Sequence, residues 1–138
     1  MARAAQQTVF AFTLNQSNGV PVYRQIIDQI QAAIASGRLM PGSQLPTVRQ
    51  VAVDLAINPN TVMRAYRELE IRGVLATQQG TGTFIADRPT ERDEAHRDRL
   101  LDQFVSEFVS RAGAQGFTLQ EVIGRLRDLL PEAETRRT

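Results

Sequence analysis

The segment from Thr47 to Gly73 constrains the fold of this chain most. Thr47 can cap a short helix over 48–55, whose apolar residues recur on one face. After a tight turn, Asn58 and Pro59 form a strong helix start, because an N-cap residue precedes a proline at the first helical position. The second helix continues to the residue before Gly73, which is a left-handed cap. Two short helices joined in this way predict a helix-turn-helix.

Two short runs of strand-forming residues, 74–79 and 83–86, follow at once and flank the tripeptide 80–82, Gly-Thr-Gly. A glycine-rich tip of this kind joins the strands of a β-hairpin. A hairpin placed directly after a helix-turn-helix is a wing. The fold class that we predict is therefore mainly α with a small β-hairpin wing, with a winged helix-turn-helix domain over residues 1–88.

The residues before the helix-turn-helix predict two further elements. Apolar residues alternate between Phe10 and Leu14, which predicts a short strand over 8–14 with one buried face. Pro21 stands where a first helical residue belongs, and apolar residues follow it at helical spacing. This first helix is expected to end near Gly37.

Residues 89–138 form the second predicted domain, two amphipathic helices with a frayed tail. The first helix begins in a run of mixed charge and is expected to break at Gly113 and Gly116. The second helix opens with a capping box that begins at Thr118, and Pro131 ends it.

Composition narrows the possible classes of function. The chain has no cysteine, which excludes disulfides, thiolate metal sites and thiol catalysis. It has one histidine. His96 lies in a run of mixed charge, where a solvated side chain is favoured over a metal ligand. No motif places a carboxylate pair in a cleft, so we expect neither an enzyme nor a metal or other cofactor. No apolar run reaches the length of a membrane span, and we expect a cytoplasmic protein with no membrane partner.

The distribution of charge is compatible with nucleic-acid binding but does not identify it. Residues 20–88 carry seven arginines and five acidic residues, whereas residues 89–138 carry eight arginines and ten acidic residues. The weak basic bias of the first part suits a surface that faces phosphates, and it is equally typical of a solvated exterior.

The order of the elements points to DNA. An α-helix fits the major groove of B-DNA, and the residues at its leading end reach base edges. Asparagine pairs with adenine, arginine pairs with guanine, and a threonine methyl contacts the thymine methyl. The candidate DNA-binding residues lie at the starts of the two helices and at the hairpin tip: Thr47, Arg49, Asn58, Asn60, Thr61, Arg64, Gly80, Thr81 and Gly82.

Each of these candidates also has a purely structural interpretation. In this interpretation Thr47 and Asn58 are helix caps and nothing more, and Thr61 and Arg64 are solvated surface. In the same interpretation the two glycines form a hairpin turn and have no contact with DNA. They are not a nucleotide-binding phosphate loop, because no Gly-Lys-Ser/Thr follows. The combined order of elements therefore carries the hypothesis.

The spaced motifs of the first domain resemble the N-terminal module of the GntR family of bacterial regulators. They are Pro21-Val-Tyr-Arg-Gln-Ile26, Gly42-Ser-Gln-Leu-Pro46, Pro46-Thr-Val-Arg49, Asn58-Pro-Asn-Thr-Val62, Arg64-Ala-Tyr66, Leu69-Glu70, Gly73 and Gly80-Thr-Gly-Thr-Phe-Ile85. The resemblance covers about Phe10 to Ala86. The Asn-Pro-Asn-Thr run and the short two-helix tail are most similar to the YtrA-type subfamily.

The resemblance implies a winged-helix dimer on a palindromic operator, usually acting as a repressor. It also implies DNA contacts from Arg49, from Thr61 in the recognition helix and from the wing-tip Gly82. Many relatives have arginine where this chain has Pro59 and Met63, so Asn60 and Arg64 become the better candidates for base contact. The large effector domains of other branches are not expected in a chain of this length, and no residue points to an effector.

The C-terminal helices are predicted to form a dimer. Neither can bury its apolar stripe alone, and a second copy of the pair would cover both stripes while matching two operator half-sites. The alternative is that the helices fold back on their own DNA-binding domain. The candidate dimerisation residues, all apolar and at helical spacing, are Leu101, Phe104, Val105, Phe108, Leu119, Val122, Ile123 and Leu126.

A second class of function competes with DNA binding, since a winged helix can also serve as an adaptor for protein or RNA. Binding that falls steeply with salt and prefers duplex DNA over single strands would separate the two.

Overall fold

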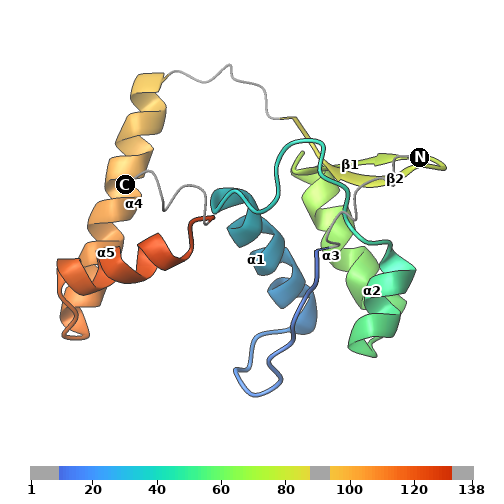
Figure 1. Ribbon diagram of the computed structural model, residues 1–138, viewed down its shortest axis with the longest axis horizontal. Coiled ribbons are helices and arrows are strands. Elements are labelled where there is room, and N and C mark those ends of the chain that lie inside the picture. Colours follow the sequence, from blue (N-terminus) through green and yellow to red (C-terminus); the bar gives the residue numbers. More distant parts are fainter. Residues whose placement is uncertain (1–9, 88–93, 132–138) are drawn as a thin grey trace. The chain divides into compact units, whose positions relative to one another are not determined.

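The computed structural model describes residues 10–87 and 94–131. The chain divides into two compact units, residues 1–88 and residues 89–138. The first unit contains α1 (Val22–Ala35), α2 (Val48–Leu55), α3 (Pro59–Ile71), β1 (Leu75–Gln78) and β2 (Gly82–Ile85), and the second contains α4 (Glu94–Ala114) and α5 (Leu119–Asp128) (Figure 1). The predicted fold class, mainly α with a β-hairpin wing and two C-terminal helices, is confirmed.

Local capping defines α2 and α3. The Thr47 side chain accepts a hydrogen bond from the backbone N–H of Gln50 at 3.0 Å, and the Asn58 side chain accepts one from that of Asn60 at 2.8 Å. Each bond satisfies a donor that would otherwise be unpaired at a helix start. Ala56, between the helices, has a left-handed conformation with φ 56° and turns the chain into α3. Both helices therefore begin where the sequence predicts.

The core of the first unit lies where α3 packs against α1, α2 and β1. Its most completely buried side chains are Ile26, Ile27, Ile30, Val62 and Leu69. Burial of a large aliphatic side chain contributes about 1.5–3 kcal/mol. One face of α3 is thus committed to stability, and its other face is left for the surface.

The hairpin is held by the connector that precedes α2. β1 and β2 pair antiparallel, with Leu75 opposite Ile85. On its other side β2 bonds to the connector: the N–H of Leu45 donates to the carbonyl of Thr83 at 2.9 Å, and the N–H of Ile85 donates to that of Ser43 at 2.8 Å. β2 therefore has bonded neighbours on both edges, β1 on one and the connector on the other, and the connector bonds fasten the wing to the helix-turn-helix.

The predicted strand over 8–14 is wrong for the residues that the structure describes. Residues 10–14 alternate in burial as expected, but they form no strand; residues 8 and 9 lie outside the described part. The reason is that glutamine side chains of α1 bond this backbone. Gln29 both donates to the Thr13 carbonyl at 2.7 Å and accepts from its N–H at 2.9 Å, and Gln25 makes the same pair of bonds with Asn15.

The start of α1 is one residue later than predicted. Pro21 is the N-cap and not the first helical residue, because its ψ of 146° is extended. Its carbonyl oxygen accepts hydrogen bonds from the N–H groups of Arg24 and Gln25 at 3.0 and 3.1 Å. The helix ends at Ala35, close to the expected end.

The C-terminal helices differ from the prediction in two places. α4 continues through Gly113 to Ala114, because one glycine costs a helix only about 1 kcal/mol, and the chain turns at Gly116. α5 begins with the predicted capping box, in which Thr118 and Glu121 bond each other reciprocally. It ends at Asp128, before the expected end at Pro131. The expected frayed tail, 132–138, lies outside the described residues.

Candidate nucleic-acid interface

The leading end of α3 is open to solvent within the first unit. Asn58, Asn60 and Arg64 are exposed and Thr61 is half-buried, whereas Val62 on the same helix is fully buried. The helix therefore presents polar side chains along the face that the core does not use. Within its own unit, nothing covers the end of the helix that is predicted to enter a DNA groove.

Four of the predicted DNA-binding residues lie together around one hollow. This hollow has a volume of about 430 Å³ and is lined by Asn58, Asn60, Thr61 and Arg64 from α3 and by Val22 and Tyr23 from α1. The guanidinium carbon of Arg64 lies 3.8 Å from the centre of the Tyr23 ring. Tyr23 was not among the predicted site residues. The only signal for it was its place in the Pro21–Ile26 motif.

Arg49 and Thr47 lie at the start of α2 and do not line this hollow. Both are exposed, and the Thr47 hydroxyl serves as the cap of α2. The start of α2 is tied to α3 by Tyr66, whose hydroxyl donates to the carbonyl oxygen of Pro46 at 2.7 Å. Burial raises the pKa of Tyr66 above its ordinary value, so the hydroxyl stays protonated and able to donate.

Of the predicted wing residues, Gly80 and Thr81 lie in the turn between the two strands and Gly82 is the first residue of β2. Gly80 and Thr81 are exposed and Gly82 is half-buried. Gly82 has φ 135°, a conformation that favours glycine, and a Cβ there would lie 2.6 Å from Nε2 of Gln44. The same Gln44 amide donates to the carbonyl of Thr81 at 3.1 Å. Gln44 thus holds the wing tip, and it was not among the predicted site residues.

The exposed arginines differ in how their charge is compensated. Within the part of the chain that the structure describes, the one ion pair joins Arg72 to Glu68 at 3.1 Å. Arg49 and Arg64 have no such acidic partner there. Their positive charges are therefore available to phosphates or base edges, whereas that of Arg72 is already paired.

The described residues contain no cluster of three or more metal-ligating side chains and no helix that could cross a membrane. His96 is exposed on α4, in agreement with the expectation of a solvated side chain. No residue of α4 or α5 that the structure describes is fully buried.

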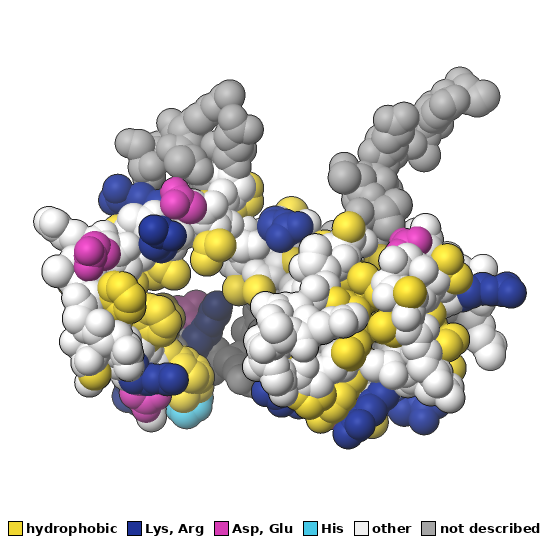
Figure 2. All heavy atoms as spheres, turned by 90° about the horizontal axis from the view of Figure 1, so that it is seen from below, with side chains coloured by type: hydrophobic (Ala, Val, Ile, Leu, Met, Phe, Trp, Pro, Cys, Tyr) yellow, Lys and Arg dark blue, Asp and Glu magenta, His cyan; other side chains and the backbone are white. Residues whose placement is uncertain are grey.

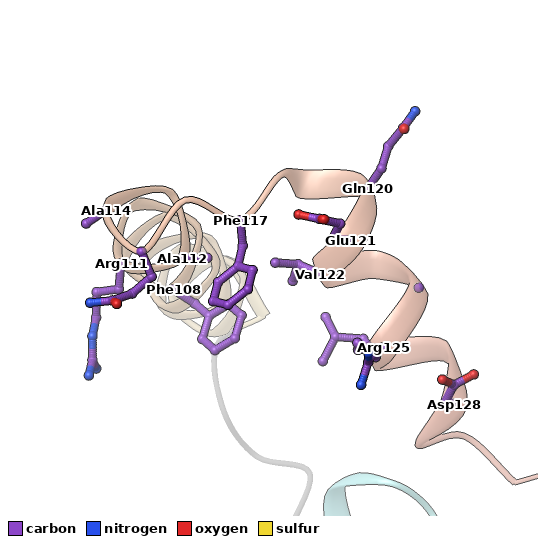
Figure 3. Close-up of a pocket in the computed structure, with 13 residues that line it drawn as sticks. Phe108, Arg111, Ala112, Ala114, Phe117, Gln120, Glu121, Val122, Arg125 and Asp128 are labelled. Carbon is purple, nitrogen blue, oxygen red and sulfur yellow. The ribbon is translucent and has the colours of Figure 1, made fainter.

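The candidate dimerisation residues lie on an apolar surface of the second unit. Phe104 is 66% exposed and Phe108 53%. Hydrophobic side chains are visible at the surface of this unit (Figure 2). An open groove of about 1,070 Å³ lies between α4 and α5, and Phe108, Phe117 and Val122 are among the residues that line it (Figure 3). Phe117 was not among the predicted residues.

Comparison with known proteins agrees with this geometry. The family model described as bacterial regulatory proteins, gntR family, matches residues 22–85. The chain is 40% identical over 109 residues to the HTH-type transcriptional repressor YtrA of Bacillus subtilis, covering 79% of this chain and 84% of that protein. It is 39% identical over 103 residues to the uncharacterized HTH-type transcriptional regulator YhcF of the same organism, covering 75% and 84%.

Solved structures are similar over most of the chain. A transcriptional antiterminator from Listeria monocytogenes matches with a TM-score of 0.61 and 31% identity, covering 86% of this chain and 88% of that one. YtrA from Sulfolobus acidocaldarius, a GntR-family transcription factor, matches with a TM-score of 0.55 and 27% identity, covering 73% and 99%.

Proposed function

The chain belongs to the GntR family of bacterial regulatory proteins and is a DNA-binding transcription regulator, and on that premise we propose that it represses transcription as a homodimer bound to a palindromic operator. The observation that supports this proposal most is the open leading end of α3, where four polar side chains surround one hollow. Membership of a family of regulatory proteins also supports the expectation that the chain is not an enzyme.

The proposal assigns separate tasks to the candidate residues. Arg64 and Thr61 read base edges, because they project from the exposed face of α3 without filling the core. Asn60, which is exposed at the same end of α3, is the third candidate for base contact. The side-chain oxygens of Asn58 and Thr47 are already used as caps, so their contribution is to present the backbone of the helix starts to phosphates. Arg49 binds a phosphate near the start of α2.

The wing supplies a second contact to the same duplex. Gly80, Thr81 and Gly82 form its tip, and two of the three carry no side chain that would keep a phosphate backbone or a minor groove at a distance. Gln44 keeps this tip in a fixed position relative to the connector. The wing is therefore presented to the duplex in a defined orientation.

The dimer is proposed from the second unit. Its helices carry apolar side chains, most of them exposed, that a second copy of the chain would cover. The members are Leu101, Phe104, Val105, Phe108, Leu119, Val122, Ile123 and Leu126. A two-fold dimer places two copies of α3 on two half-sites, which is why a palindrome is expected. Repression is proposed because the similar YtrA of Bacillus subtilis is described as a repressor. We expect the protein in the cytoplasm, because that is where the bacterial chromosome lies.

The test is selection of binding sites from a random duplex library, followed by affinity measurements at several salt concentrations. We expect a palindromic consensus, and binding to it that weakens steeply with salt. Arg64→Ala and Thr61→Ala should lose about 5- to 150-fold in discrimination between the consensus and single-base variants, the range for one lost base contact. Arg49→Ala should weaken binding to all duplexes alike.

Arg72→Ala is the matched control, because it removes the arginine that follows α3 as its C-cap residue and whose charge is already paired with Glu68. Its affinity and discrimination should stay within about twofold of wild type. Equal affinity of the wild-type chain for the consensus and for random duplex would refute sequence-specific binding. A preference for single-stranded RNA over duplex DNA would favour the adaptor alternative instead.

A further inference from the structure

We propose that Tyr23 is a positioning residue for base recognition, whose ring holds the guanidinium of Arg64 in one orientation at the DNA-facing surface of α3. This inference rests on the proposed function of Arg64. It starts from the short distance of 3.8 Å between the Arg64 guanidinium carbon and the centre of the Tyr23 ring. Tyr23 lies near the start of α1, 41 positions before Arg64, so the two helices must pack together to create the contact.

The Tyr23 ring is a fixed support. Tyr23 is half-buried and packs against the hydrophobic core of its unit. The core side chains of α1 and α3, among them Ile26 and Val62, are fully buried. Because the two helix backbones cannot slide past each other without disturbing these contacts, the ring stays in place when DNA is absent.

Stacking leaves the hydrogen-bond donors of Arg64 available. A guanidinium is planar, and its N–H groups point outward within that plane, whereas the ring covers only one of its two faces. A bidentate contact to guanine uses the in-plane donors. Arg64 has no ion pair within the described part of the chain that would compete for them. The stack therefore restrains the side chain without occupying the groups that recognise a base.

The restraint matters because a free arginine loses several rotatable bonds when it binds. An arginine that is already oriented loses less conformational entropy on contact with DNA. The hollow beside the stack, lined by Asn58, Asn60 and Thr61, leaves space for a partner of Arg64 to approach. Replacement of the ring should accordingly weaken discrimination at the base that Arg64 contacts, and at no other base.

The experiment combines three variants with the duplex that the wild-type chain enriches from a random library. Tyr23→Phe keeps the ring and should retain wild-type discrimination. Tyr23→Leu keeps an apolar side chain but removes the ring, and should lose about two- to tenfold in discrimination at a single base position. In the Arg64→Ala background, Tyr23→Leu should have no further effect, because the side chain that it positions is gone.

Two outcomes would overturn the proposal. If Tyr23→Phe loses as much as Tyr23→Leu, the hydroxyl contacts the DNA itself and the ring is not the functional group. If Tyr23→Leu has the same effect with and without Arg64, the residue acts through general stability. Phe10→Leu is the matched control, because it removes the ring that lies 5.4 Å from the guanidinium of Arg38, beyond the other end of α1. It should leave discrimination unchanged.

A measurement without DNA separates this proposal from the proposed function. In the free wild-type protein, the ring current of Tyr23 should shift the NMR signal of the Arg64 Nε–H group upfield, and Tyr23→Leu should abolish that shift while Tyr23→Phe preserves it. Absence of the shift refutes the positioning role even if operator binding is specific. Presence of the shift in a chain that shows no sequence preference refutes the proposed function, and with it the role of Tyr23 in recognition.

Discussion

Replacement of Tyr66 by phenylalanine tests how α3 is held against the start of α2. The hydroxyl that it removes donates to the carbonyl oxygen of Pro46 at 2.7 Å, and the Tyr66 side chain is only 3% exposed. Pro46 is buried as well. Because the phenyl ring remains in the core, the change is confined to one buried hydrogen bond.

The expected loss follows from the burial of both partners. A hydrogen bond contributes about 0.5–1.5 kcal/mol net, and a buried acceptor that loses its donor costs about 1–3 kcal/mol. We therefore expect the free energy of unfolding to fall by about 1–2 kcal/mol. In a unit of this size each kcal/mol corresponds to about 4–8 °C in Tm, so Tm should fall by about 4–16 °C.

The assay is urea and thermal unfolding followed by circular dichroism, at equal protein concentration, since association of the chain would make Tm depend on concentration. Tyr23→Phe is the matched control, because it deletes a hydroxyl from a half-buried tyrosine that makes no hydrogen bond to another described residue. Unfolding free energies of Tyr66→Phe and wild type that agree within about 0.3 kcal/mol would refute the reasoning, because a buried bond of this kind contributes more than that.

Three further predictions follow from the fold. Burial raises the pKa of Tyr66 above its ordinary value of 10.0, so its contribution to stability is complete below that pH and is lost as pH rises through the higher pKa of the folded state. In urea titrations between about pH 9 and 12, wild type should therefore lose stability more steeply than Tyr66→Phe. Gly82→Ala, at φ 135°, should destabilise the wing and lower operator affinity by about 1–2 kcal/mol in a binding assay, and unchanged affinity would contradict the strain argument. Phe104→Ser with Phe108→Ser should halve the mass measured by sedimentation, whereas Ile71→Ser, which changes a side chain that is 80% exposed on α3, should not.

The helix boundaries were predictable where a local signal sets them. The caps at Thr47, Asn58 and Thr118 act over two or three residues, and each helix begins where its cap predicts. The strand expected over 8–14 failed because a strand needs a partner that alternation alone does not reveal. In this chain the partners are the side chains of Gln25 and Gln29.

The candidate interface was predictable only where a local signal marks its residues. Asn60, Thr61 and Arg64 could be found because their position at the leading end of a capped helix predicts exposure, which the structure shows to be high or partial. Tyr23 and Gln44 could not be found, because each acts through a contact with a residue 37 or more positions away. Such contacts exist only once α1, the connector and the wing have packed.

On the proposed function, the two faces of helix α3 have separate tasks, one in stability and the other in DNA recognition. Val62, Ala65 and Leu69 are completely buried, so a change in their volume would leave a cavity or force the core apart. Asn60 and Arg64, on the other face, are exposed and can be exchanged without cost to the core. Operator preference can therefore diverge through the exposed residues alone, provided that the contacts which orient α3 are kept. On the proposed function, changes at the exposed face should alter which sequence is bound, whereas changes at Tyr66, which is 3% exposed and bonds to Pro46, should alter whether the helix is in place to bind it.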